Sequence, residues 1–513
     1  MRRLSTSLLA LAVMAGAAAG DLHASEIKVG FTLDALTLDP ANHRKRETET
    51  ILRNMYDGVV TRDANMQVVP QLAESFTQVD PTTWEAKLRS GVTFHDGSPL
   101  TAGDVAFTFH RLIDENAMDG QTSPRKGLLG PLVDVEAVDD STVRFRLSEP
   151  WPILPAMLPF QEVVSKSFTE AAGPGGLAER ENGTGPFKLA EWRKGEAVIM
   201  DRYDDYYGGS TEIPPVGPAC VERAIFQIIP ESSSRVAALL AGDVDIINEL
   251  PPSDIATVEN SDNAKVMTVN GTRSFYIALN MEKPPFDNVK VREALAHAID
   301  KQLVIDKILN GLAVPIEGIL SPDAFAFDPA LAGHPYDPDK TASLLEEAGL
   351  GDGIDVTMDV EGAFKDIAEA VASLLTKAGI RTTVQVGEGS QLVDKWRTEG
   401  AKVREGDMWF TSWGNGTLDP YDIFNPVLMT DARGNSSGYA NPELDGLLTA
   451  ASTETDADKR MQLYIQAQDL VQKDVPMVFL WVPQDVYGVS KRVSGWQPSA
   501  DSRINLHDAC VDG

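Results

Sequence analysis

The chain has 513 residues, of which 43% are hydrophobic and 24% are charged, and its formal net charge is -31. This length suggests roughly three structural units at about 150 residues each, and the composition is that of a globular protein. With 45 basic against 76 acidic residues, the charge excludes nucleic acid and anionic lipid as electrostatic partners. No apolar run in the body of the chain approaches the ~18 residues of a membrane span.

The amino terminus has the layout of a secretory signal peptide. Arg2 and Arg3 precede an apolar run over residues 8–19, and small residues lead to Ala24. We expect cleavage after Ala24, so residues 1–24 are absent from the mature protein. No cysteine lies near that site, which predicts a periplasmic protein and not a lipoprotein. The alternative is a retained N-terminal helix.

The first part of the mature chain predicts a strand, a loop and a helix. Residues 27–36 favour a strand, and a polar loop with the basic residues 43–46 follows it. A helix should then carry Ile51, Leu52 and Met55 inward. The basic cluster is unusual in so acidic a chain, and clustered guanidinium groups suit carboxylate or phosphate ligands. The alternative is a solvated loop whose charges pair with Glu47 and Glu49.

Residues 84–105 predict a strand, a turn and a capped helix. Alternation over residues 84–89 indicates a strand with one buried face, and Asp96-Gly97 forms turns. Thr101 with Asp104 resembles a capping box. Further on, Gly183-Thr184-Gly185-Pro186 lacks the Lys-Ser/Thr of a phosphate-binding loop.

The second half of the chain alternates helices and strands. Apolar spacing predicts one helix from Val289 that carries Leu303 inward, another opened by Asp337-Pro338, and a third over residues 367–378. Strands should follow at residues 380–386 and 408–413. This alternation predicts a largely parallel sheet.

Several of these strings resemble extracytoplasmic solute-binding protein family 5, the peptide, nickel and opine-type binding components of bacterial ABC importers. Residues 84–105 match nearly every fixed position of W-x-F-x-L-R-x-G-V-x-F-H-D-G-x-P-x-T-A-x-D-V, and Gly183-Thr184-Gly185-Pro186-Phe187 and Val291-Arg292-Glu293-Ala294-Leu295 extend the resemblance. It implies an α/β, two-lobed periplasmic-binding-protein fold of type II with the ligand cleft between the lobes. The implied parts are lobe I over 25–270 with an inserted subdomain at about 76–181, lobe II over 271–482, and a return to lobe I over 483–513.

The resemblance also places the two cysteines, Cys220 and Cys510, in the same lobe. A disulfide that holds the C-terminal tail is therefore one expectation, since an exported chain meets an oxidising compartment. Two free, buried thiols are the alternative. Two cysteines so far apart in sequence do not suggest a zinc site, and we expect no metal.

The expected ligand contacts lie on both lobes. Residues 411–420 resemble the W-x-x-D-x-x-D-P loop of the family, and Trp413 should end a strand at the cleft. The alternative is that Trp413 fills the core. The family's peptide binders place an acidic residue where this chain has Gly416, so the usual partner of a peptide ammonium is missing. The candidate ligand-binding residues are Trp413, Gly414, Asn415, Gly416, Asp419, Arg44, His43 and, from the opposite lobe to Arg44, Arg433.

We therefore expect a receptor without catalytic residues or cofactor. It should act as a monomer, bind a peptide or peptide-like solute by lobe closure, and deliver it to a membrane permease pair driven by cytoplasmic ATPases. The missing acid and the basic loop favour an acidic or N-blocked ligand, such as a γ-glutamyl peptide like glutathione, an opine or a sugar acid; a nickel chelate is a weaker alternative. The alternative class is a secreted hydrolase, although the chain has no G-x-S-x-G, no H-E-x-x-H and only seven scattered histidines. A partner of a sensory receptor would share this architecture.

Overall fold

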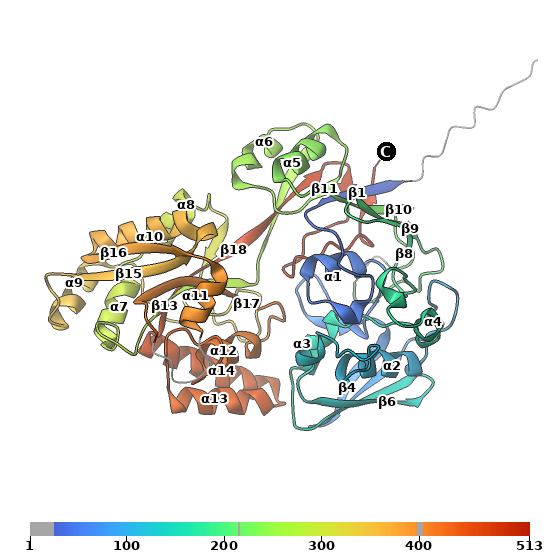
Figure 1. Cartoon of the computed structure of the whole chain (residues 1–513), viewed down its shortest axis with the longest axis horizontal. Coiled ribbons are helices and arrows are strands. Elements are labelled where there is room, and N and C mark those ends of the chain that lie inside the picture. The colour runs from blue at the N-terminus through green and yellow to red at the C-terminus, as the bar shows by residue number, and fades with distance from the viewer. Residues whose placement is uncertain (1–24, 214–215, 398–403, 513) are drawn as a thin grey trace, which may run out of the picture.

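The computed structural model describes residues 25–213, 216–397 and 404–512, so the expected signal peptide lies outside the described residues. Two bodies lie side by side and are bridged by the long strand β18 (Met477–Ser490) (Figure 1). We call the body that contains the first strand lobe I and the other lobe II. The domain boundary expected near residue 270 falls between β12 (Ala264–Asn270) and β13 (Arg273–Leu279), and the one expected near residue 482 falls inside β18. Both boundaries stay a prediction.

Lobe I is built on a mixed sheet in which β1 lies between two parallel partners and β18 closes one side. Its first strand ends at Phe31 and is therefore shorter than the predicted strand over residues 27–36. In sheet order the strands are β8 (Phe187–Arg193), β9 (Ala197–Arg202), β10 (Arg223–Ile228), β1 (Glu26–Phe31), β11 (Ile246–Ile247) and β18, with β12 (Ala264–Asn270) also paired to β18. The helices of this lobe are α1 (Arg46–Leu52), α3 (Leu154–Met157), α4 (Lys166–Ala172), α5 (Ser232–Ala241) and α6 (Ile255–Glu259).

Four strands between residues 73 and 147 form a separate antiparallel sheet within lobe I. Helix α2 (Ala102–Ile113) covers this sheet (Figure 1). The predicted capping box of α2 is confirmed, because the Asp104 carboxylate accepts the Thr101 N–H at 2.9 Å. The limits of the inserted subdomain, 76–181, stay a prediction. The strands in order are β4 (Ala73–Asp80), β5 (Thr83–Leu88), β7 (Thr142–Leu147) and β6 (Leu132–Asp139).

Lobe II contains a mixed sheet, so the prediction of a largely parallel one was wrong. The pairs β16–β15 and β15–β17 are parallel, whereas β17–β13, β13–β18 and β14–β18 are antiparallel. The antiparallel half is made by strands distant in sequence, which local alternation does not reveal. The strands in order are β16 (Ile380–Gly387), β15 (Ile354–Glu361), β17 (Met408–Gly414), β13 (Arg273–Leu279) and β18, with β14 (Ala313–Pro315) also paired to β18.

The helices of lobe II cover this sheet and confirm most of the predicted positions. The exception is the single helix from Val289, which is divided into two. The Asp300 side chain accepts the Leu303 N–H at 3.0 Å and caps a new helix, which leaves Leu303 exposed. The helices are α7 (Val289–His297), α8 (Lys301–Lys307), α9 (Pro338–Glu347), α10 (Lys365–Lys377), α11 (Gly389–Trp396), α12 (Tyr421–Leu428), α13 (Pro442–Thr453) and α14 (Ala457–Asp474).

The chain crosses between the lobes at two adjacent places. One is the β12–β13 connection and the other is the middle of β18, which pairs with β13 and β14 up to Pro483 and with β12 from Gln484 onward. The Gly271 N–H donates to the Pro483 carbonyl at 2.9 Å, and a Cβ on Gly271 would lie 2.8 Å from that oxygen. Glycine therefore allows the two crossings to pack closely.

The lobes also touch away from these crossings, at what we call the rim contacts of Arg62, Met66 and Trp151. Met66 follows strand β2 (Val60–Arg62), precedes β3 (Val68–Pro70), and packs in an apolar cluster made mostly of lobe II residues. Arg62 Nη2 donates to the Thr417 carbonyl at 2.5 Å. The Trp151 and Tyr421 rings meet edge to face with centroids 6.3 Å apart. The described conformation thus has the lobes in contact.

Cys220 and Cys510 form a disulfide with a Cα–Cα distance of 5.2 Å. Cys510 belongs to β20 (Cys510–Val511), which pairs with β19 (Val493–Ser494) after the chain has returned from lobe II. The bond therefore fastens the end of the chain to the loop before β10.

We expect Cys510→Ser to lower the free energy of unfolding of lobe I by about 2–4 kcal/mol, because an open chain has more unfolded-state freedom. Urea denaturation with and without dithiothreitol measures the loss. Dithiothreitol should shift the wild-type midpoint to that of the variant and leave the variant unchanged. Equal midpoints for the oxidised wild type and the variant would contradict a stabilising bond.

Candidate functional site

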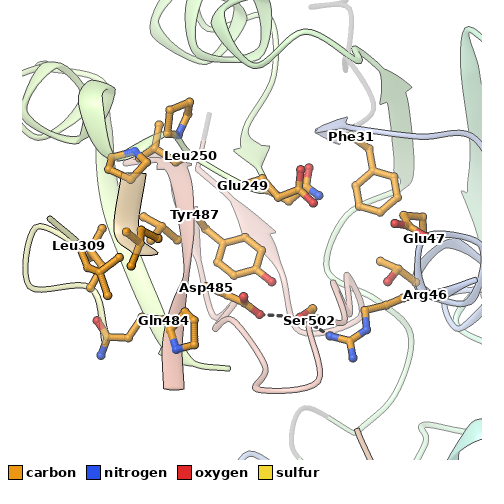
Figure 2. Close-up of a pocket in the computed structure, with 18 of the residues that line it drawn as sticks. Phe31, Arg46, Glu47, Glu249, Leu250, Leu309, Gln484, Asp485, Tyr487 and Ser502 are labelled. Atoms are coloured by element: carbon orange, nitrogen blue, oxygen red, sulfur yellow. Dashed lines mark hydrogen bonds between the residues drawn. The ribbon is translucent and has the colours of Figure 1, made fainter. Parts of the chain in front are cut away.

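Two cavities between the lobes share the side chain of Arg46. The larger, of about 630 Å³, lies beside β18 and has an apolar side from both lobes, including Phe31, Leu250 and Leu309 (Figure 2). The smaller, of about 210 Å³, is lined by residues of lobe I and by Gly416, Thr417 and Asp422 of lobe II. The larger cavity also contains Glu47, Glu249 and Asp485, and the smaller one contains Leu128, Met157 and Phe160. A solute held between the lobes would therefore meet apolar and charged groups in both cavities.

Arg46 is held in place through the crossing strand. Its Nη1 donates to Ser502 Oγ at 2.9 Å, and Ser502 Oγ donates to Asp485 Oδ2 at 2.6 Å (Figure 2). Burial raises the pKa of the Asp485 carboxyl, an effect that Ser502 and Arg46 oppose. Because Asp485 lies on β18, the guanidinium of a lobe I helix is tied to the strand that both lobes share.

Arg44 is exposed and lines the smaller cavity, with Asp422 of lobe II also on its wall. Burial raises the pKa of Asp422, and the guanidinium groups of Arg433 and Arg44 oppose the rise. Among the described residues, no ion pair joins Arg44 to Glu47 or Glu49, as the solvated-loop alternative required. The structure thus brings both predicted arginines near one carboxylate from opposite lobes, and their contact with a ligand stays a prediction.

His43 lies behind this wall. It is 3% exposed, and Arg125 Nη1 lies 3.1 Å from its Nε2. Burial and the adjacent Arg125 guanidinium lower the pKa of His43 to about 3, so the imidazole is neutral at any physiological pH. It lines neither cavity. We therefore assign His43 a supporting role behind Arg125, in place of the direct contact expected from the sequence.

Trp413 lies next to the end of strand β17, as the alternation predicted. Its Nε1 donates to the Asp422 carbonyl at 2.9 Å. The guanidinium carbons of Arg397 and Arg433 lie 4.8 and 5.0 Å from its ring centroid. The indole of Trp413 is therefore a platform on which two cations stack.

The loop after Trp413 divides into residues near the cleft and residues that support them. A Cβ on Gly416 would lie 3.7 Å from Arg46 Nη2, and one on Gly414 would lie 3.2 Å from Arg273 Nη2. Asn415 is fully buried, and its N–H donates to the Thr272 carbonyl at 2.8 Å. Asn415 therefore holds the loop to the crossing, and its contact with a ligand stays a prediction.

Asp419 is a second support of this loop. Its two carboxylate oxygens accept from Arg460 Nη1 and Nη2 at 2.8 and 2.6 Å, and both side chains are buried. Asp419 Oδ1 also accepts the Tyr421 N–H at 3.0 Å at the start of α12. This geometry gives Asp419 a supporting role in the loop, and its contact with a ligand stays a prediction.

Arg46, Arg125, Arg273, Arg397 and Arg503 were not among the predicted contacts. Arg46 carried a signal, since it belongs to the basic cluster. Arg125 and Arg503 are already paired with Glu49 and Asp501. Arg273 and Arg397 belong to no motif, so only the three-dimensional fold reveals that they reach the same loop.

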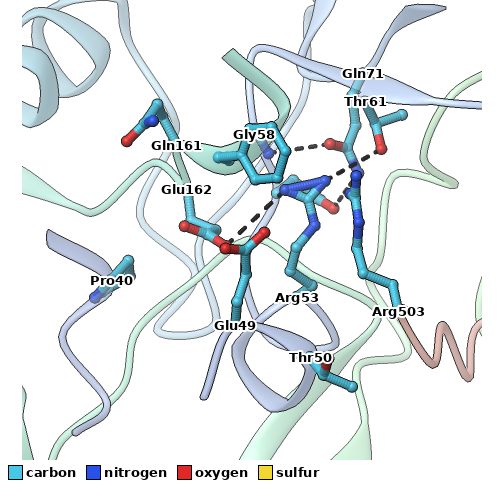
Figure 3. Close-up of polar contacts among 12 residues, drawn as sticks. Pro40, Glu49, Thr50, Arg53, Gly58, Thr61, Gln71, Gln161, Glu162 and Arg503 are labelled. Carbon is cyan, nitrogen blue, oxygen red and sulfur yellow. Dashed lines mark hydrogen bonds and ion pairs between the residues drawn. The ribbon is translucent and has the colours of Figure 1, made fainter. Parts of the chain in front are cut away.

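A buried carboxylate lies beneath the wall of the smaller cavity. Glu162 is 3.9 Å from both Arg53 and Arg125, and Glu49 lies next to it (Figure 3). Burial raises the pKa of Glu162 to about 7 despite the attraction of the two guanidinium groups, and Glu49 adds to the rise. Burial, together with Arg503, in turn lowers the pKa of Arg53 to about 10.

We expect Glu162→Gln to flatten the pH dependence of stability. The folded-state pKa lies above the ordinary 4.5, so this contribution is full below about pH 4.5 and is lost as pH rises through 7. Urea midpoints at pH 5, 6, 7 and 8 should therefore fall less in the variant than in the wild type. Glu170→Gln, an exposed control in α4, should follow the wild type. Parallel curves for Glu162→Gln and wild type would contradict a raised pKa.

Among the described residues, no cluster of three or more His, Cys, Asp or Glu side chains has the arrangement of a metal site. No helix in the same residues is long and apolar enough to span a bilayer.

Comparison with known proteins supports this architecture. Residues 67–435 match the family described as bacterial extracellular solute-binding proteins, family 5 Middle. Heme-binding protein A of Haemophilus influenzae is 28% identical over 88% of this chain and 86% of its own length. Glutathione-binding protein GsiB of Pectobacterium atrosepticum is 27% identical over 98% of this chain and 97% of its own. The structure of HbpA2 from Haemophilus parasuis superposes with a TM-score of 0.86 at 25% identity and covers 95% of this chain and 100% of that one.

Proposed function

Since the chain belongs to family 5 of the bacterial extracellular solute-binding proteins, and is therefore a solute-binding protein and not an enzyme, we propose that its lobes close on a small, anionic, peptide-like solute. The periplasmic protein then delivers this solute to the permease of an ABC importer, whose ATPases supply the energy. The secreted-hydrolase alternative is set aside, because the family binds solutes.

The observation that carries the proposal is that the guanidinium group of Arg46 lies close to Gly416. Family members that hold a peptide ammonium place an acidic side chain at the position of Gly416, and here a guanidinium group approaches that position instead. Arg44, Arg46 and Arg433 make no ion pair with a described carboxylate. A solute carboxylate would satisfy such groups through charge-assisted hydrogen bonds.

The volume and lining of the cavities support a peptide-like body. The larger cavity combines apolar walls with polar side chains such as Gln484 and Asn248, which suits a short chain of amide groups and small apolar segments. Glutathione is a γ-glutamyl peptide of this kind, and a relative of similar length is named for binding it. Opines and sugar acids share the negative charge and form the second ligand class.

A thermal-shift panel tests the proposal. Glutathione, an opine, a sugar acid and the neutral tripeptide Ala-Ala-Ala would each be added at increasing concentration. A solute at 100 times its Kd adds about 2.7 kcal/mol of stability. We expect one or more of the anions to stabilise the protein, and mass spectrometry to recover that anion unaltered. Stabilisation by the neutral tripeptide with none by any anion would overturn the proposal.

A further inference from the structure

Three guanidinium groups from different parts of the fold reach one short segment, residues 412–416, at the end of β17. Arg273 Nη1 donates to Ser412 Oγ at 3.2 Å, and Arg397 Nη2 donates to the Ser412 carbonyl at 3.4 Å. Arg46 Nη2 would lie 3.7 Å from a Cβ on Gly416. Arg46 comes from lobe I, Arg397 from lobe II, and Arg273 is the first residue of β13, directly after the crossing.

Acidic side chains lie near these cations, Asp485 near Arg46 and Glu361 near Arg273, but they do not pair with them. Among the described residues none forms an ion pair with a carboxylate, and Arg46 reaches Asp485 only through Ser502. Burial lowers the pKa of Arg273, and the next contributions are the like charges of Arg46 and Arg397. The side chains of Arg46 and Arg273 are exposed and that of Arg397 is half-buried, so water solvates them when no ligand is present and all three can receive an anion.

We infer that Arg46, Arg273 and Arg397 form an oxyanion site that accepts a carboxylate, or a group of the same charge and shape, and that this anion couples binding to lobe closure. The inference rests on the proposed anionic solute. Arg46 lines both cavities, whereas Arg273 and Arg397 line neither and would meet the anion where they approach residues 412–416. Without an anion, Arg46 of lobe I and Arg397 of lobe II repel each other and oppose approach of the lobes. With an anion between them, the same two residues attract it from both sides, so the closed form is favoured.

Two expected results distinguish this anion site from a merely structural cluster of arginines. Removal of one cation should weaken anion binding, and it should also relieve repulsion in the ligand-free protein. A structural arginine gives the opposite second result, because its loss destabilises the ligand-free fold. Glutamine keeps a hydrogen-bond donor without the charge, so Arg46→Gln, Arg273→Gln and Arg397→Gln are the appropriate variants. Lys45→Gln is the matched control, since Lys45 adjoins Arg46, is exposed and lines neither cavity.

The experiment uses inorganic phosphate and glutathione as probes at constant ionic strength, with melting temperature and the radius of gyration from solution scattering as readouts. We expect each Arg→Gln variant to melt at or above the wild-type temperature without probe, and to need at least tenfold more of any anion that stabilises the wild type. Ligand-free Arg46→Gln and Arg397→Gln should also be more compact than the wild type. Lys45→Gln should match the wild type in all readouts.

The outcomes separate this inference from the proposed function. If a panel anion stabilises the wild type and all three variants equally, the function stands and the oxyanion site is wrong. The site is also wrong if the variants melt below the wild type without probe and respond normally to it. If phosphate alone shows the predicted pattern and no peptide-like solute binds, the site stands and the peptide-like ligand is wrong.

Discussion

Replacement of Asp419 by alanine is expected to lower the free energy of unfolding by about 3–5 kcal/mol, the typical cost of leaving a buried charge without its partner. Arg460 is 6% exposed and gives two of its donors to Asp419. The variant would leave this guanidinium group in an interior where water cannot replace the carboxylate. Urea denaturation followed by tryptophan fluorescence measures the loss.

An exposed arginine–aspartate pair that is also joined by two hydrogen bonds provides the control. Arg381 donates twice to Asp355 at 2.8 Å, but both side chains are open to solvent. Asp355→Ala should therefore leave the urea midpoint close to that of the wild type. The double variant Asp419→Ala, Arg460→Met should recover part of the loss, because it removes the unpaired charge. A cost for Asp419→Ala no larger than that of Asp355→Ala would show that the buried pair does not stabilise the loop.

Gly416→Asp is expected to invert the charge preference of the cleft. The new carboxylate would lie beside Arg46 and would take the place of a solute carboxylate. A charge-assisted hydrogen bond contributes about 1.5–3 kcal/mol, so affinity for the panel anion that stabilises the wild type should fall about ten- to hundredfold. Isothermal titration calorimetry measures the change.

Gly416→Asn is the matched control, since it adds the same volume without the charge. A Cβ at this position meets only Arg46 Nη2, at ordinary contact distance, so both variants should fold. The asparagine variant should lose less affinity than the aspartate variant. Equal losses would show that space at Gly416 matters and that its charge environment does not. An unchanged affinity in both would remove Gly416 from the site.

Much of the fold could be predicted from local sequence. The cap at Asp337-Pro338, the capping box at Thr101 and the strand ending near Trp413 all depend on residues close together in the chain, and all are present. The break before α8 was missed because apolar spacing continues across it, while one capping carboxylate at Asp300 decides the structure. The sheet of lobe II was wrongly predicted because β13 and β18 pair over long sequence separations.

The site was predictable only where residues belong to a motif or a cluster. The loop at Trp413 and the basic residues 43–46 gave such signals. His43 was predicted to contact the ligand, but it is buried behind Arg125. Sequence does not show which member of a basic cluster is buried. Arg273 and Arg397 carry no local signal, since their proximity depends on how β13 and α11 are placed around β17.

The rim contacts bear on how affinity is set in this protein. Met66, Arg62 and Trp151 join the lobes without lining either cavity, so they stabilise one state of an equilibrium whatever solute is present. The apparent Kd equals the intrinsic one divided by the fraction of molecules already competent to bind. Substitutions at the rim contacts could therefore change the solute concentration at which the importer responds. The residues that select the solute would stay the same.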